Sequence, residues 1–355
     1  MNSAIRLATA LLAAALFIIT AAQAQQYQVT DLGTLGGSFS QANSINLVSQ
    51  VAGASTVVND TASHAFRWTK RRGMKDLGTL SGGINSSAQA ISDAGIIVGV
   101  SDYNDPINGL VSHAFADING KMRDLGTLGG STAQANGINI AGQVVGFSFV
   151  ADNSAQHAVL WQHQGIQDLG TLGGTNSQAL GINIRGQVVG SSDTASGSTD
   201  PFLWDSKHGM KDLGTLGGMS AQANAVNFFG QVVGYSSLLG ETATDAFLYS
   251  NGKLTDLGTL GGSFTEANDI DFFGDIVGSS NTMGDADVHA FIYTQKGGLQ
   301  DLNNLIPTNS GWDLNSAQSI KPGDDFEENG VRIVGVGVII ATGEQHAFLL
   351  TPTRE

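Results

Sequence analysis

The sequence predicts an all-β protein in which one four-stranded unit is repeated around a ring. First, the heptapeptide "DLGTLGG" begins at Asp31 and returns, whole or altered, at a nearly constant spacing. Second, short runs rich in β-branched and aromatic residues alternate with turns rich in Gly, Asn and Ser, and no run keeps a helical period. Third, the 355 residues include 48 glycines and only 13% charged residues. This composition suits many short strands joined by tight turns.

The repeat has the length of a β-propeller blade. Its copies begin at Asp31, Asp76, Asp124, Asp168, Asp212, Asp256 and, in the decayed form "DLNNLIP", Asp301. Successive copies are 44 to 48 residues apart. The unit that follows Asp124 contains the strand-like runs "QANGIN", "QVVGFS", "HAVLW" and "GIQDLGTL", and four strands in this length are typical of a blade. Consecutive apolar residues, as in "VVG" and "FLW", indicate strands covered on both faces, as in blades stacked around an axis.

The two ends of the chain predict how the ring closes. The sequence after residue 25 begins with a fourth-strand pattern, "QYQVTDLGTLGG", and ends with a third-strand pattern, "HAFLLTPTRE". The third-strand pattern occurs seven times, so we expect a seven-bladed β-propeller in which the N-terminal strand completes the last blade and removes an exposed edge. The alternative is a β-solenoid of short coils, which would have no use for this shift of one strand between the ends.

Residues 1–24 have the pattern of a secretory signal peptide. Arg6 precedes an apolar run, and the small residues Ala22 and Ala24 mark a cleavage site. The alternative is a membrane anchor, for which the run is too short. We therefore expect export to the bacterial periplasm or beyond, and one domain over residues 25–355. The chain has no cysteine, which excludes disulfides and a lipoprotein anchor.

The charge of the chain narrows the classes of partner. The net charge is −15 and becomes −16 without the leader, which holds Arg6 and no acidic residue. Such a surface repels nucleic acid and anionic lipid heads. We expect a monomer that binds a glycan or a surface protein, and no cofactor other than a cation such as calcium.

The ordered motifs "DLGTLGG", "IN-x-x-GQVVG" and "HAF" resemble those of the HAF-repeat family of bacterial extracellular proteins, which have kelch- or WD-like propeller character. The resemblance covers nearly all of the chain after the leader. It implies secretion and a repeat fold, and it implies no particular activity. The sequence departs from the pattern at His157 ("HAV"), Asp200 ("DPF") and Asp245 ("DAF").

The repeated polar residues are expected to hold the scaffold together. The Asp of each copy should accept backbone N–H groups at a bend, and the Thr should join a network with the third-strand His. Metal binding is the alternative for the histidines, but one residue per blade lies too far from the next to share an ion. The histidines at this position are His64, His113, His157, His289 and His346.

Function is expected where the repeat breaks. The polar loops between second and third strands differ in every repeat, which favours a non-enzymatic binding module with its site on that face. Two acidic breaks could hold calcium: Glu266, Asp269 and Asp271 in one repeat, and Asp102 and Asp105 in another. No catalytic motif is present. The alternative function is a propeller-type polysaccharide hydrolase or lyase that uses the first of these carboxylate groups.

Overall fold

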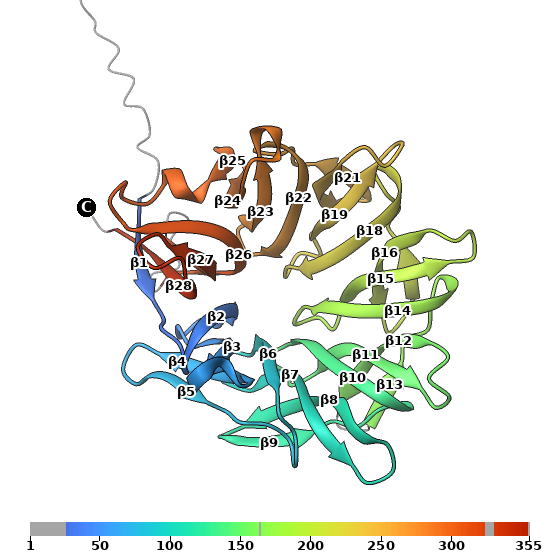
Figure 1. Ribbon diagram of the computed structural model, residues 1–355. Helices are drawn as coiled ribbons and strands as arrows, with labels where there is room; N and C mark the ends of the chain where they lie inside the picture. Colours follow the sequence, from blue (N-terminus) through green and yellow to red (C-terminus); the bar gives the residue numbers. More distant parts are fainter. Residues whose placement is uncertain (1–25, 163–164, 324–329, 354–355) are drawn as a thin grey trace, which may run out of the picture.

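The computed structural model describes residues 26–162, 165–323 and 330–353. The expected signal peptide at 1–24 lies outside the described residues. The chain is all-β, and its strands form antiparallel four-stranded units arranged around a common centre (Figure 1). Single parallel bridges join some neighbouring units into larger sheets, and each unit is called a sheet below. Among the described residues, no helix has the length and hydropathy needed to span a membrane.

Each sheet is named here by its first strand, which lies nearest the centre (Figure 1). The first strands are β2 (Gly36–Ile45), β6 (Ser86–Ile91), β10 (Gly129–Ile138), β14 (Gly173–Ile182), β18 (Gly217–Val226), β22 (Gly261–Ile270) and β26 (Trp312–Pro322). The second strands are β3 (Val51–Val57), β7 (Ile97–Asp105), β11 (Val144–Val150), β15 (Val188–Thr194), β19 (Val232–Leu238), β23 (Ile276–Thr282) and β27 (Val331–Ile339).

The outer half of each sheet is shorter. The third strands are β4 (Ser63–Thr69), β8 (Gly109–Ile118), β12 (Gln156–Gln162), β16 (Thr199–Asp205), β20 (Thr244–Ser250), β24 (Val288–Thr294) and β28 (Gln345–Pro352). The fourth strands are β5 (Gly73–Asp76), β9 (Lys121–Asp124), β13 (Gly165–Asp168), β17 (Gly209–Asp212), β21 (Lys253–Asp256) and β25 (Gly298–Asp301). Single 3-10 turns lie at η1 (Val58–Asp60), η2 (Met283–Asp285) and η3 (Leu302–Asn304).

The N-terminal strand β1 (Tyr27–Asp31) pairs with β28, near the other end of the chain. The pairing is antiparallel and runs from Tyr27 opposite Pro352 to Asp31 opposite Phe348. β1 thus takes the position beside β28 that a fourth strand takes beside the third strand in the other sheets. Tyr27 is 1% exposed in the resulting core.

The core lies between neighbouring sheets and depends on close approach at the second strand. Third strands contribute fully buried phenylalanines such as Phe66, Phe115 and Phe202. A Cβ added at Gly53 would collide with the backbone oxygen of Gln41 and would lie 2.9 Å from the Phe66 ring. The second-strand glycine is therefore required, because any side chain would separate the strands or displace the ring.

The predicted end of the fourth strand was wrong. The run "GIQDLGTL" was expected to be one strand, but β13 ends at Asp168. The backbone bends there because Gly170, with φ +76°, donates its N–H to Asp168. The Gly-Gly pair that follows begins β14 instead of ending β13.

Candidate functional site

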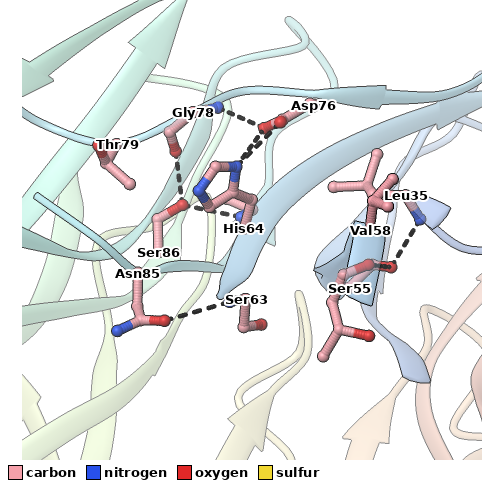
Figure 2. A network of polar contacts seen from close by, with 12 residues as sticks. Leu35, Ser55, Val58, Ser63, His64, Asp76, Gly78, Thr79, Asn85 and Ser86 are labelled. Atoms are coloured by element: carbon pink, nitrogen blue, oxygen red, sulfur yellow. Dashed lines mark hydrogen bonds and ion pairs between the residues drawn. The ribbon is translucent and has the colours of Figure 1, made fainter. Parts of the chain in front are cut away.

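The repeated Asp fixes the bend after the outermost strand. In every copy its carboxylate accepts the N–H of the residue two positions later at 2.6 to 2.8 Å. Figure 2 shows this arrangement at Asp76, which also contacts His64. A side-chain acceptor at the bend satisfies an N–H that has no strand partner.

The third-strand histidines meet these Asp residues one sheet at a time. Nδ1 lies 2.7 to 3.0 Å from the carboxylate in the pairs His64–Asp76, His113–Asp124, His157–Asp168, His289–Asp301 and His346–Asp31. The last pair joins residues near the two ends of the chain. In the described part of the chain, no three His, Asp or Glu side chains form a group that could hold a metal ion.

The Thr of the repeat makes a different contact from the one expected. Thr34 Oγ1 donates to the carbonyl of Gly37 and accepts from the N–H of Gly36, so it braces its own link and does not reach the histidine. A serine of the β6 sheet, and not the Thr, connects the link after a fourth strand to the third strand of the same sheet as that fourth strand. Ser86 Oγ donates to the carbonyl of Gly78 and accepts the N–H of Ala65 (Figure 2).

Asp replaces the repeat His at Asp200 and Asp245, and the carboxyl groups there face the repeat Asp. Burial, together with the charge and hydrogen bond of Asp256, raises the pKa of Asp245 to about 6. Burial and the charge of Asp212 likewise raise the pKa of Asp200. Two carboxyl groups so placed favour a shared proton over two charges.

Restoring the repeat residue with Asp245→His should therefore stabilise the protein at neutral pH. Because folding raises the pKa of Asp245, its protonated form stabilises the folded protein. That stabilisation is complete below pH 4 and is lost as pH rises through about 6. The gain in Tm from the variant should be larger at pH 7.5 than at pH 4.5, because only there does it replace a charged pair of carboxylates. Thermal unfolding over this range measures it, with exposed Asp287→His as the control. A gain independent of pH would contradict the interpretation.

The first strands surround a central cavity of about 1020 Å³. Amide side chains are frequent in its wall, among them Gln41, Gln89, Gln134 and Gln222. The next inward position holds asparagines that bind the backbone of the following sheet. Asn43, Asn136, Asn224 and Asn268 donate to the carbonyls of Ala88, Ala179, Ala267 and Ala317 at 2.8 to 2.9 Å. These contacts fix the wall and join adjacent sheets.

The acidic break of the β22 sheet lies in this wall, and its carboxylates already have partners. Asp269 Oδ2 accepts from Ser319 Oγ, Ile320 N and Lys321 Nζ at 2.8 to 3.1 Å, which joins β22 to β26. Asp271 Oδ1 accepts the N–H groups of Phe273 and Asp275 at the turn.

The remaining predicted ligands have partners of their own. Burial raises the pKa of Glu266, whose carboxylate accepts a hydrogen bond from Ser279. Asp102 accepts from Asn85, whereas Asp105 accepts two backbone N–H groups within its own turn. Calcium binding at either acidic break stays a prediction, and so does catalysis by Glu266, Asp269 and Asp271.

An exposed aromatic cluster stands at the rim of the cavity. It consists of Phe228 and Phe229, between β18 and β19, and Phe272 and Phe273, between β22 and β23. Each side chain is 39 to 56% exposed, and neighbouring ring centroids lie 5.0 to 5.8 Å apart. Arg185, in the turn between β14 and β15, places its guanidinium carbon 4.5 Å from the Phe228 centroid.

This aromatic cluster is not on the face that the sequence singled out. The expected site was on the variable loops between second and third strands, but these four phenylalanines lie on turns between first and second strands. Three of them line the central cavity, namely Phe228, Phe272 and Phe273. The signal was the "FFG" that two consecutive repeats place where others have "IAG" or "IRG".

The chain resembles solved β-propellers in structure alone. No family model and no curated protein matches it. It aligns with the β-propeller domain of the Trilobed protease from Pyrococcus furiosus at a TM-score of 0.52 and 9% identity, over 89% of this chain and 98% of that one. An acylaminoacyl peptidase from Pyrococcus horikoshii aligns at 0.50 and 11% identity, over 90% of this chain and 52% of that one.

A weaker likeness links the chain to a sugar-binding protein. The BP39L lectin from Burkholderia pseudomallei aligns at a TM-score of 0.45 and 7% identity, over 91% of this chain and 98% of that one, which is too weak to indicate a shared ligand. The two stronger alignments, at identities this low, show the β-propeller fold and carry no information about activity.

Proposed function

We propose that this protein is an exported, non-enzymatic binding module built on a seven-bladed β-propeller, with β1 completing the last blade. The pairing of β1 with β28 and the His346–Asp31 contact support the closure. The HAF-repeat resemblance supports export, as does the leader pattern of residues 1–24. The ligand that we propose is a neutral glycan, bound at the rim of the central cavity.

The observation that carries this proposal is the aromatic cluster beside an amide-lined cavity. Ligand sites combine apolar and aromatic surface with a few fixed polar groups that set orientation. Sugar rings present hydroxyl groups, which Asn and Gln side chains can both donate to and accept from. They also present C–H faces, which pack against aromatic rings. Phe229 and Phe272 supply such rings, and Gln134 and Gln222 supply amides within the cavity.

The charge of the chain favours a neutral glycan over an acidic one at this site. Glu266, Asp269 and Asp271 line the same cavity, and Lys321 offsets only part of their charge. The net charge of −15 adds a long-range repulsion of anions. A protein partner is the other outcome that the binding experiment distinguishes.

The double variant Phe229→Ala/Phe272→Ala should lose glycan binding without unfolding. Truncating exposed aromatic anchors typically weakens binding by about 2 kcal/mol or more, or roughly thirtyfold. Calorimetric titration with cellohexaose, maltohexaose and mannohexaose measures the effect.

The matched control is Leu239→Ala/Met283→Ala, which removes two exposed apolar side chains from loops between second and third strands. It should bind as the parent protein does. Equal binding by both double variants would contradict the site. If the parent binds none of the three hexasaccharides but captures a protein that Phe229→Ala/Phe272→Ala does not capture, the ligand at this site is a protein and not a glycan.

A further inference from the structure

The interface between the β2 and β6 sheets breaks the repeat inside the core. Arg67 of β4 stands where other repeats have Leu160, Leu203 or Leu248. Asp117 of β8 stands where they have an aromatic residue such as Trp161. The two substitutions meet, because Arg67 Nη2 lies 3.1 Å from Asp117 Oδ1 and 2.8 Å from the carbonyl of Gly95. An ion pair thus replaces apolar packing at one junction.

A pocket of about 470 Å³ lies beside this ion pair. Its wall includes Arg67, Arg71, Arg72, Lys75 and Asp117. Asp117 is its only acidic residue in the described part of the chain, and Arg67 neutralises it. Arg67 Nε is buried and has no hydrogen-bond partner among the described residues. A buried donor left without a partner is costly, which marks this junction as one not built for packing alone.

The cations around the pocket are not arranged for stability. Arg67 and Lys75 lie directly opposite each other on β4 and β5, where like charges destabilise a sheet. Arg71 and Arg72 are exposed in the turn between these strands. Four of the 16 Lys and Arg residues line this pocket beside one acidic residue, although the chain as a whole is acidic. A local positive field in a negative protein draws anions to this pocket.

We propose that this pocket binds an oxyanion: a carboxylate, phosphate or sulfate group carried by a small molecule or a sugar. Arg71, Arg72 and Lys75 in the pocket wall offer a site for such a group, since arginine binds planar and tetrahedral oxyanions through paired N–H donors. Asp117 holds Arg67 in place at the pocket wall. This site is separate from the central cavity and does not depend on the glycan proposal.

Calorimetric titration of the full chain with inorganic phosphate, sodium sulfate and glucuronate, at constant ionic strength in chloride, tests the proposal. The parent protein should bind at least one of the three. Arg71→Gln/Arg72→Gln should weaken that binding by about tenfold or more, because each lost charge-assisted bond is among the stronger kinds. The matched control Lys207→Gln/Lys253→Gln removes the same charge from exposed positions of two other sheets.

The three anions separate the sources of the ligand. Binding of phosphate or sulfate indicates a tetrahedral oxyanion, whereas binding of glucuronate alone indicates a carboxylate sugar. Either result supports the site if the arginine double variant loses the binding and the lysine double variant keeps it. Binding of none of the three, or equal weakening in both double variants, would overturn the proposal. Phe229→Ala/Phe272→Ala should bind the anion as the parent does, so failure of the glycan site leaves this result readable.

Discussion

Deleting residues 26–31 should lower the Tm by about 10 °C or more and promote self-association. The deletion removes the whole of β1, whose five residues pair with β28. It also removes the fully buried Tyr27, and loss of a buried aromatic side chain alone costs about 3 to 5 kcal/mol. β28 would be left as an unpaired edge. Differential scanning calorimetry and light scattering measure the two effects.

The matched control shortens the hairpin tip between β7 and β8. Replacing residues 105–109 with an Asn-Gly pair removes exposed chain, including Ile107, which is 91% exposed, and keeps a turn suited to a hairpin. Its Tm should stay within a few degrees of the parent's. Comparable, small effects from both changes would show that β1 does not complete the last blade, and would favour the solenoid alternative.

Arg67→Leu should destabilise the protein by about 3 kcal/mol, because it strands a charge in the core. Asp117 is 1% exposed, and without Arg67 its carboxylate keeps only the N–H of Gly120. The substitution makes the residue match other repeats, so a purely statistical view of the repeat predicts the opposite sign. Urea unfolding monitored by tryptophan fluorescence gives the free energy of unfolding.

The double variant Arg67→Leu/Asp117→Trp distinguishes the effect of leaving Asp117 unpaired from the effect of leucine itself at position 67. It rebuilds the apolar pair of the other repeats and should recover most of the stability lost in the single variant. It should also fill the anion pocket. Two results would contradict this explanation. Arg67→Leu could be as stable as the parent, or the double variant could be no more stable than Arg67→Leu; in either case the unpaired Asp117 is not the cause of a loss of stability.

Much of the architecture follows from the repeat because local chemistry and global fold agree there. Strand positions and the bend at each Asp depend on short runs of β-branched and aromatic residues, on glycine and on a side-chain acceptor, all visible in the sequence. The pairing of β1 with β28 was expected from the order of motifs at the ends. The exact end of the fourth strand was missed because "LGTL" is apolar, yet the hydrogen bond from Gly170 to Asp168 breaks the strand before it.

The sites were harder to predict because they depend on which side chains meet across sheets. "FFG" occurs in two repeats 44 residues apart, and only the ring arrangement brings Phe229 and Phe272 to a centroid distance of 5.0 Å. Arg67 and Asp117 belong to different repeats as well. Asp269 looked like a free ligand in the sequence, but Lys321 and the backbone of the next sheet already bind it.

Hydrogen–deuterium exchange in the presence of the tightest-binding hexasaccharide tests most directly whether the ligand sits at the rim of the central cavity. Slower exchange is expected in the turns at 183–187, 227–231 and 271–275, which carry Arg185 and the four phenylalanines. The loop at 239–243, on the other face, should exchange at its unbound rate. Protection confined to loops between second and third strands would contradict the account and place the binding surface on the opposite face of the ring.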